Sequence, residues 1–496
     1  MNLSTSNQPQ DSSIHILHDK ESSHQELGSP SEDTDQQYHH DWKYALKHYF
    51  PHYTYQPIGT VQIEERPSWF YCVAYGIQHV LAMFSGVIVL PLILGYDSNT
   101  SLFFSGVSTL IFFIVTGGRV PSYLGCSGSF VSIILTISNY TSTSNSEMNT
   151  NTAAVQGAIL VLSLAYAVVA LVVIVFGCKW LEFFMPPIVT GSIITSIGLH
   201  LSFLSYDEAT KSSFDTYMAI ATASAIMLIS VYAPTNALRR IALLLGTMTG
   251  YFIHAMCNLK GVGPSIDYSE IASNPWIRAP SVYFNLKFDS SSIGMVMPIL
   301  IVLLAENLGH MKAIGSITHR PMLRYVGRAY LGDAMGCFVA SLTGAVPFTT
   351  YAENIGVLSV TQVFSPLVIL FAAVFAMLLG FFAKFSAIVK SIPQGVLGGV
   401  TIILYTLIAI TGIRIWVVNK VDFNDTRNIF VGGLPVILAT VMQTPLQVNN
   451  FQLDGIGAAT FGSIILYQVL QGYDGLAMYR KSIKSAFNKN KPRETV

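Results

Sequence analysis

The chain has 496 residues, of which 51% are hydrophobic and 11% charged, with a mean hydropathy of +0.50. A soluble domain carries roughly 25% charged residues, so this composition excludes a soluble protein and indicates an integral membrane protein. Lys plus Arg and Asp plus Glu both number 27, a balance that gives no sign of nucleic-acid binding. The five cysteines lack CxxC spacing, which favours small buried hydrophobes over a disulfide or metal framework.

The first part of the chain, 1–66, differs from everything after it. Polar residues dominate it and apolar residues are too sparse to form a core, so the sequence predicts a polar, disordered cytosolic tail. Its histidines are irregularly spaced, which favours a plain tail over a metal site. No apolar stretch with a cleavage site is present, so no signal peptide is predicted.

Apolar segments follow in quick succession from Trp69 onward, most of them about 17–25 residues long, as a ~30 Å hydrocarbon core requires. The sequence predicts an all-α polytopic membrane protein with fourteen spans. A polar loop at 259–290 separates two sets of seven. The first set is placed at 69–95, 101–117, 121–138, 154–177, 186–205, 215–233 and 240–258. The second set is placed at 293–313, 327–344, 347–362, 364–385, 393–412, 428–444 and 455–472.

Basic residues test the orientation of these spans. With the N-terminus in the cytosol, most loop Lys and Arg residues fall on the cytosolic side, including a basic C-terminal tail at 476–496. An even number of spans with both termini in the cytosol fits best. The missing signal sequence, together with the signature described below, predicts a bacterial inner membrane protein.

The two sets of spans resemble each other. Val120-Pro121-Ser122-Tyr123 opens the third span as Val346-Pro347-Phe348-Thr349 opens the tenth. Segments that contain proline and glycine also open the fifth span, at 185–192, and the twelfth, at 392–399. Because seven is odd, the second copy must be inverted in the membrane. Paired Gly/Pro-interrupted segments in two halves point to a transporter's binding site.

The stretch 346–361 is predicted to start extended and then turn helical. Pro347 donates no hydrogen bond, and the residues after it favour a strand, whereas a helix begins near Glu353 and Asn354. A carboxylate at bilayer depth is costly, and irregular backbone there is tolerated only where it is buried or lines a cavity. The helix would direct free N–H groups at this junction.

The eighth span carries a second ionisable pair. Glu306 and His310 are four residues apart, so both project from one helical face, and that face should point at a cavity. The carboxylate can accept ring N–H groups of a neutral ligand, and the histidine can hold a proton near neutral pH. The alternative is a buried pair that braces the bundle. A metalloprotease motif is excluded because its leading histidine is absent.

Two other spans offer polar or small residues. The third span contains the run 125–130, in which Gly128 lets a planar ligand approach the backbone and Phe130 could pack nearby. A pure helix-packing role for these small residues is the alternative. In the first span, Gln78 and His79 are expected to hydrogen-bond across helices rather than to touch a ligand.

Two carboxylates, a histidine, an asparagine amide and backbone N–H groups suit a flat, neutral, hydrogen-bonding ligand. They suit a simple anion such as sulfate poorly, because Glu306 and Glu353 would repel it and no Lys or Arg lies mid-span. These residues exclude sulfate or bicarbonate as first choice, but they do not name the ligand.

The run Glu353-Asn354-Ile355-Gly356, followed by Thr361, resembles the signature of the nucleobase–ascorbate transporter family, also called nucleobase:cation symporter family 2. The wider run 349–357 is most similar to its bacterial uracil permeases. Supporting matches extend over about 67–475. They are Gln78-His79 with Ala82-Met83-Phe84, Val120 to Gly125, Ala305-Glu306 with Gly309-His310, Gly412-Ile413-Arg414, and Val421-Asp422 with Arg427-Asn428.

This resemblance implies two inverted seven-span repeats, short antiparallel strands in spans 3 and 10, and a core domain moving against a gate domain in a homodimer. The implied divisions are the tail 1–66, core 67–185, gate 186–290, core 291–390, gate 391–475 and the tail 476–496. The base would lie between Glu306 and Glu353, with His310 nearby and backbone groups of Ala352 and span 3 completing the site. Asn354 and Thr361 belong to the signature, and Thr361 is expected in a structural polar network.

Three positions depart from the uracil-permease pattern. Gly128 stands where an aromatic residue is common, Gln362 where Arg is frequent, and Ala352 where the motif has glycine. Glutamate at 353 favours the uracil branch over typical xanthine or urate carriers. The open position at Gly128 leaves a purine substrate as an alternative.

The sequence thus predicts a proton-coupled importer of uracil or a related nucleobase, without enzyme activity or cofactor and with the proton as coupling ion. Glu306, His310 and Glu353 are the candidates to carry that proton, and coupled sites titrate as a set. The predicted partners are the base, protons, membrane lipid and a second copy of the chain. The rival hypotheses are a xanthine-type purine symporter, a sulfate-transporter-type anion exchanger and a non-transporting receptor.

Overall fold

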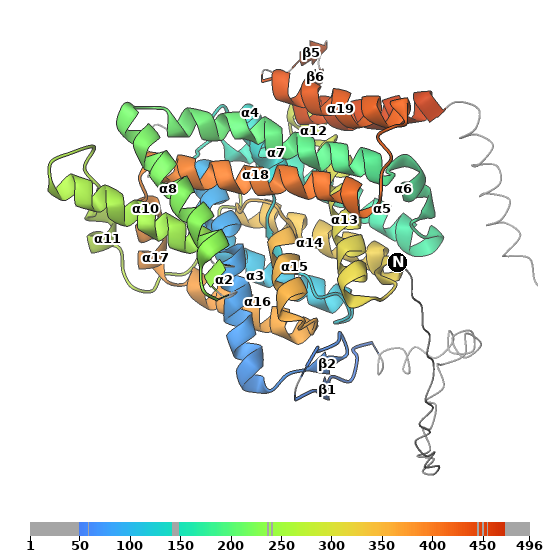
Figure 1. Ribbon diagram of the computed structural model, residues 1–496, viewed down its shortest axis with the longest axis horizontal. Helices are drawn as coiled ribbons and strands as arrows, with labels where there is room; N and C mark the ends of the chain where they lie inside the picture. Colours follow the sequence, from blue (N-terminus) through green and yellow to red (C-terminus); the bar gives the residue numbers. More distant parts are fainter. Residues whose placement is uncertain are drawn as a thin grey trace, which may run out of the picture. The chain divides into compact units, whose positions relative to one another are not determined.

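A computed structural model describes residues 49–57, 59–140, 148–235, 238–239, 242–443, 446–448, 451–453 and 455–471. Met1–Tyr49 forms a separate unit, and the account below concerns the unit Phe50–Val496 (Figure 1). Residues 1–48 of the predicted tail 1–66, and all of the predicted tail 476–496, lie outside the described residues.

Helices make up most of the described chain, as expected for a polytopic membrane protein. In the first half the helices are α2 (Trp69–Ile93), α3 (Ser98–Val115), α4 (Val131–Ser138), α5 (Thr152–Phe176), α6 (Lys179–Phe184), α7 (Pro187–Ala209), α8 (Ser213–Tyr232), α10 (Ala242–Leu259) and α11 (Ser269–Ser273). In the second half they are α12 (Ser290–Val296), α13 (Ile299–Thr318), α14 (Val326–Thr343), α15 (Ala352–Thr361), α16 (Pro366–Gly380), α17 (Ala383–Lys390), α18 (Gln394–Val418), α19 (Thr426–Val441) and a last helix at 455–471.

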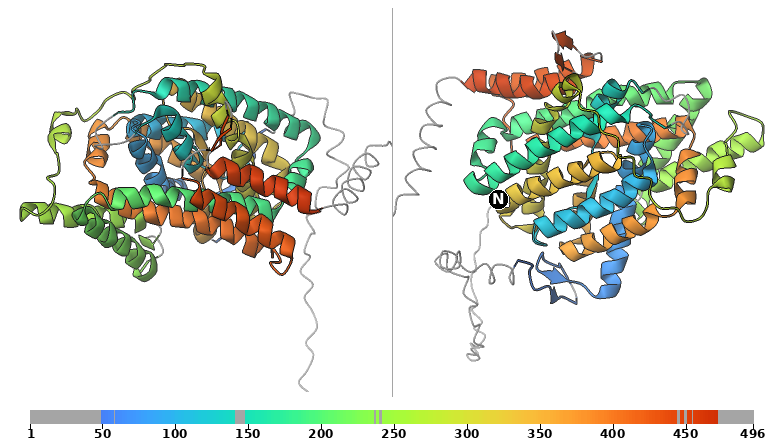
Figure 2. Two further views of the ribbon diagram at one scale, coloured as in Figure 1. Left: turned by 90° about the horizontal axis from the view of Figure 1, so that it is seen from above. Right: turned by 180° about the vertical axis from the view of Figure 1, so that it is seen from behind.

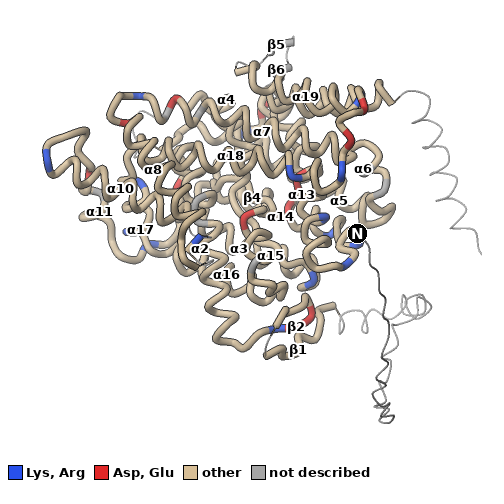
Figure 3. The backbone as a smooth tube through the Cα atoms, viewed as in Figure 1, with Lys and Arg blue, Asp and Glu red and all other residues tan. Residues whose placement is uncertain are grey.

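Length and composition identify the membrane-crossing helices. Among the described residues, eight helical segments are long and apolar enough to cross a bilayer, and four shorter apolar helices accompany them. Figure 3 shows how few Lys, Arg, Asp and Glu residues lie along the described helices. The chain is therefore a multi-pass integral membrane protein, because a bilayer core needs about 20 consecutive apolar residues in each helix that crosses it.

The helices pack in two groups. One group joins α2, α3, α5, α14 and α16, and the other joins α7, α8, α10, α18 and α19 (Figures 1 and 2). Glycines allow α7 and α18 to approach closely. A Cβ at Gly198 would collide with the backbone of Ala409, and one at Gly412 would collide with the backbone of Thr195. Small residues at such crossings are how membrane helices gain contact without a hydrophobic driving force.

Two short strands interrupt the helical pattern. One of them lies in the stretch 346–361, which is predicted to start extended and then turn helical. Strand β3 (Leu124–Cys126) pairs antiparallel with β4 (Phe348–Thr350), with Gly125 opposite Thr349. Two further backbone bonds extend this pairing, from Ser127 N–H to the Pro347 carbonyl (2.9 Å) and from Tyr351 N–H to the Tyr123 carbonyl (3.0 Å). Both strands are buried, so the pairing satisfies backbone groups that water cannot reach.

Each strand leads directly into a half-helix. After β3 comes a 3₁₀ turn, η2 (Gly128–Phe130), and then α4; after β4 comes α15. The N-terminal ends of both half-helices therefore meet at the strand pair, with their free backbone N–H groups directed at the same place.

The structure differs from the predicted disordered tail at residues 50–57 and 59–66. Strands β1 (Thr54–Tyr55) and β2 (Glu65–Arg66) pair in parallel, and Val61 forms a bridge with Val363 between α15 and α16. Ile63 is buried in the main apolar core. Low hydrophobicity predicted disorder, but backbone pairing with the helical body holds this segment, and local composition cannot reveal such pairing.

Candidate functional site

Glu306 anchors the candidate site from the middle of α13. The Ser129 hydroxyl, from the η2 turn, donates a hydrogen bond of 3.1 Å to Glu306 Oε2. These residues are far apart in sequence, and the half-helix that follows β3 brings them together. A hydroxyl donor beside a carboxylate stabilises its ionised form.

His310 lies one turn further along α13 and is buried. Its Nδ1 is 2.9 Å from Thr350 Oγ1, the last residue of β4. Glu306 and His310 thus share one helical face, as their four-residue spacing requires. A hydroxyl can donate or accept, so this pair accommodates either imidazole tautomer.

Ala352 and Glu353 occupy the first turn of α15, where a carboxylate complements the helix dipole. The preceding residue, Tyr351, donates from its hydroxyl to the Cys126 carbonyl across 2.6 Å. A Cβ on Gly125 would lie within 2.5 Å of the Tyr351 ring, so the ring fits only because position 125 is glycine. Tyr351 therefore locks the start of α15 onto β3.

These groups line a cavity of about 70 Å³ between the two half-helices. Its wall contains five of the predicted site residues, Glu306, His310, Glu353, Ala352 and Gly128. The other lining residues are Gly86, Leu90, Cys126, Ser127, Ser129, Ile194, Ile197, Thr350, Tyr351, Leu404, Ile408 and Thr411.

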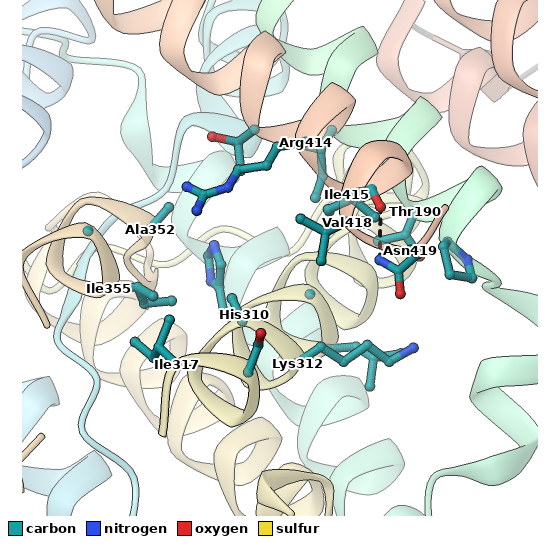
Figure 4. A pocket seen from close by; sticks show the side chains of 18 of the residues that line it. Thr190, His310, Lys312, Ile317, Ala352, Ile355, Arg414, Ile415, Val418 and Asn419 are labelled. Atoms are coloured by element: carbon teal, nitrogen blue, oxygen red, sulfur yellow. Dashed lines mark hydrogen bonds between the residues drawn. The ribbon is translucent and has the colours of Figure 1, made fainter. Parts of the chain in front are cut away.

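A larger vestibule of about 420 Å³ adjoins this cavity. The two share Ile194, His310, Ala352 and Thr411, so the vestibule and the cavity meet at these residues. In Figure 4, Arg414 extends from α18 toward the side of Ala352 and His310.

The two spaces differ in charge. Among the described residues, the cavity is lined by the carboxylates Glu306 and Glu353 and by no Lys or Arg. The vestibule is lined by Lys312 and Arg414 and by no Asp or Glu of the described chain. The cavity wall therefore offers acceptors to a neutral ligand with N–H groups and is unfavourable for an anion.

Two predicted binding residues, Asn354 and Phe130, line neither space. The buried amide of Asn354 lies 3.0 Å from His79 Nδ1 and donates to the His79 carbonyl over 3.2 Å. Phe130 is fully buried in the apolar core. Asn354 and Phe130 each follow a residue that faces the cavity, Glu353 and Ser129. Successive side chains point about 100° apart in an α-helix and about 120° apart in a 3₁₀ turn, so Asn354 and Phe130 point away from the cavity.

The sequence predicts a polar network that contains Gln78, His79 and Thr361, and the structure places these three residues in different surroundings. His79 bonds across helices to Asn354, and Gln78 is half-buried. The Thr361 hydroxyl donates to the Val357 carbonyl of its own helix (2.9 Å), which is a local bond.

A buried carboxylate beside the site escaped prediction. Asp333 of α14 accepts hydrogen bonds from Asn307 Nδ2 (2.7 Å) and from the Tyr166 hydroxyl (3.4 Å). Ser129 and Thr350 were likewise not singled out. An acidic residue inside a predicted span was the available signal for Asp333, since such residues mark functional or bracing positions by default. No group of His, Cys, Asp and Glu in the described part of the chain is arranged to hold a metal ion.

Comparison with known proteins places this geometry among permeases. The Permease family (Xan_ur_permease) matches residues 71–447. RutG of Escherichia coli (strain K12), named as a pyrimidine permease, is 38% identical over 426 residues, covering 85% of this chain and 95% of its own. The uracil permease of Bacillus caldolyticus is 30% identical over 429 residues, covering 83% and 95%.

Solved structures share the fold at low identity. SLC26A9 superposes with a TM-score of 0.59 at 11% identity, covering 82% of this chain and 66% of that chain. The transmembrane domain of a cyanobacterium bicarbonate transporter, BicA, superposes with a TM-score of 0.53 at 13% identity, covering 80% and 96%.

Proposed function

This chain belongs to the nucleobase:cation symporter 2 family of permeases, and on that premise we propose that it imports uracil or a related pyrimidine base by proton symport. It is a transporter of the nucleobase class and not an enzyme. The observation that carries the proposal is the cavity between the half-helices, which offers two carboxylates and no Lys or Arg within the described chain.

The binding step follows from the donors of the base. Glu306 and Glu353 each accept a hydrogen bond from a ring N–H, and the backbone N–H of Ala352 meets a ring carbonyl. Ile194, Ile197 and Ile408 give the flat ring an apolar surface. Such a site rejects anions, because an added negative charge would meet two carboxylates at close range.

The proton is assigned to the set formed by Glu306, His310 and Glu353, whose titrations are coupled. Ser129 stabilises an ionised Glu306 at 3.1 Å, and Thr350 fixes the orientation of the His310 ring at 2.9 Å. The set takes up one proton on the outer side, carries it across together with the base and releases both on the inner side, so that the empty site returns unprotonated. We assign no cofactor beyond the proton.

We propose that alternating access moves a core domain against a gate domain. The core domain comprises 67–185 and 291–390, the gate domain comprises 186–290 and 391–475, and together they contain fourteen spans. The packing of α2, α3, α5, α14 and α16 apart from α7, α8, α10, α18 and α19 supports this division. The cavity lies between them, since Glu306 and Glu353 come from one part and Leu404 and Ile408 from the other. A homodimer in a bacterial inner membrane, with both termini cytosolic, completes the proposal.

A purine substrate is the second candidate, because space is available at Gly128. A Cβ added there would have Ile408 Cδ1 at 3.6 Å and Leu201 Cδ1 at 3.9 Å as its nearest neighbours. Anion exchange is disfavoured by the carboxylates, although the structural neighbours include a bicarbonate transporter. A receptor that binds a base without transporting it would show binding but no accumulation in vesicles.

The test is radiolabelled uracil uptake into proteoliposomes, with and without an inward proton gradient, with unlabelled xanthine as competitor. Gradient-dependent uptake that excess uracil blocks and xanthine does not would support a pyrimidine–proton symporter. Equal competition by xanthine would move the substrate to purines. Glu353→Ala is expected to abolish uptake while the protein remains folded in the membrane, and unimpaired uptake would overturn the role of Glu353.

A further inference from the structure

Residues 50–57 and 59–66, which we call the N-terminal brace, contact α3 and the segments that follow α3, α13 and α15. The ring of Phe50 stacks on Phe113 of α3 at 5.7 Å between centroids. The Tyr53 hydroxyl donates to the Gly118 carbonyl (2.8 Å), and burial raises the pKa of this phenol. Glu64 lies 3.4 Å from the Arg320 guanidinium, which follows the end of α13.

The main contact of the brace is with the end of α15. Val61 N–H donates to the Gln362 carbonyl (3.0 Å), and Phe364 N–H donates to the Val61 carbonyl (2.8 Å). Gln362 ends α15 in the left-handed region, with φ of 56°, so the helical series of backbone hydrogen bonds stops there. The brace therefore satisfies backbone groups that the helix break would otherwise leave unpaired.

Apolar packing fixes the same contact. The Val61 side chain is buried in a cluster with Cys72 of α2, Val363 of the α15–α16 linker and Val368 of α16. Val61 thus joins α2, the α15–α16 linker and α16 at one point.

The opposite face of α15 has little support. Ala352, Ile355, Gly356 and Ser359 line the vestibule, and a Cβ at Gly356 would have no atom within 4 Å. On its other face α15 packs against α2 and α13, with Val357 and Leu358 buried. Its ends add two further attachments, β4 with the Asn354–His79 bond at one end and the brace at the other.

We propose that the N-terminal brace positions the binding half-helix, with Val61 as the positioning residue that acts through Gln362 on Glu353. α15 has 10 residues and is roughly 15 Å long, so a shift of its C-terminal end at Gln362 tilts the helix and moves the end that carries Glu353. A binding group has to be held within about 0.5 Å of its productive position. This role rests on the proposed binding of a base by Glu353.

The experiment compares Val61→Pro with Val61→Ala in the full-length chain. Proline removes the N–H that bonds to Gln362 and alanine keeps it. Val61→Pro is expected to raise the KM for uracil uptake roughly five- to tenfold, with the maximal rate per folded protein near that of wild type. Val61→Ala keeps this N–H but shortens a buried side chain, so its KM should lie between those of wild type and Val61→Pro.

Hydrogen exchange of the amides of 352–361 provides a readout that requires no substrate. Faster exchange in Val61→Pro than in Val61→Ala is expected. If wild type transports no uracil, the proposed function fails while the exchange comparison still tests the brace. Unchanged KM and exchange, or a loss of folded protein with a normal KM in the remainder, would overturn the positioning role.

A second set of variants covers the case in which Val61→Pro does not assemble. Glu64→Arg places two like charges at the contact with Arg320 and is expected to raise KM about two- to fivefold. The swap Glu64→Arg with Arg320→Glu restores the pair and should return KM toward wild type. A swap that leaves KM as high as in Glu64→Arg would contradict the proposal.

Discussion

The hydrogen bond from Ser129 to Glu306 offers the most direct test of how the cavity handles a proton. Ser129→Ala removes a hydroxyl donor 3.1 Å from Glu306 Oε2 and changes the side chain by a single oxygen. The ionised carboxylate loses this donor, whereas the protonated form loses less. Protonation is therefore favoured in the variant.

The size of the effect follows from the charge of the acceptor. A hydrogen bond to a charged group contributes about 1.5–3 kcal/mol. One pH unit corresponds to about 1.36 kcal/mol, so the pH of half-maximal uptake should shift upward by about 1–2 units.

Ser127→Ala is the matched control. Ser127 lines the same cavity, and its buried hydroxyl has no hydrogen-bond partner among the described residues. Uptake by both variants and by wild type would be measured in proteoliposomes over a range of external pH with a fixed gradient. Superimposable profiles for Ser129→Ala and wild type, or equal shifts in both variants, would refute the reasoning.

The same geometry gives two other expected outcomes. Gly125→Ala should lower the free energy of unfolding by about 1–3 kcal/mol, because its Cβ would lie within 2.5 Å of the Tyr351 ring. A Cβ at Gly128 would have its nearest neighbours at 3.6 and 3.9 Å, so Gly128→Ala should change the free energy of unfolding by less than about 0.5 kcal/mol. Thermal unfolding of both variants in detergent checks this difference. Thr350→Val removes the partner of His310 at 2.9 Å and should raise the KM for uptake roughly two- to tenfold. An unchanged KM in concentration-dependent uptake would argue against a role for this bond.

Features with a local cause could be predicted from the sequence. Hydropathy located the helices within a few residues, because the thickness of a bilayer sets their length. The pairing of Glu306 with His310 on one face follows from helical periodicity alone. Pro347 and the β-prone residues after it indicated the extended start of the tenth predicted span, where β4 lies.

Features that depend on distant contacts could not be predicted. Ser129 and Glu306 are 177 positions apart, and Asn354 and His79 are 275 apart. Local patterns therefore suggested that Asn354 and Phe130 contact a ligand, although each is rotated away from the cavity next to a residue that faces it. The brace escaped for the same reason, since its stability comes from backbone bonds to Gln362 and Phe364 rather than from its own composition.

The pairing of β3 with β4 has a consequence for biosynthesis. Cys126 and its partner Phe348 are separated by 348 − 126 = 222 positions. At about 5–20 residues per second, the ribosome adds the second strand roughly 10–45 s after the first. During that interval β3 has no strand partner, and its open backbone groups cannot face lipid. The nascent first half must therefore wait in the insertion machinery or in a hydrated assembly, and a chain stalled before Phe348 cannot complete the site.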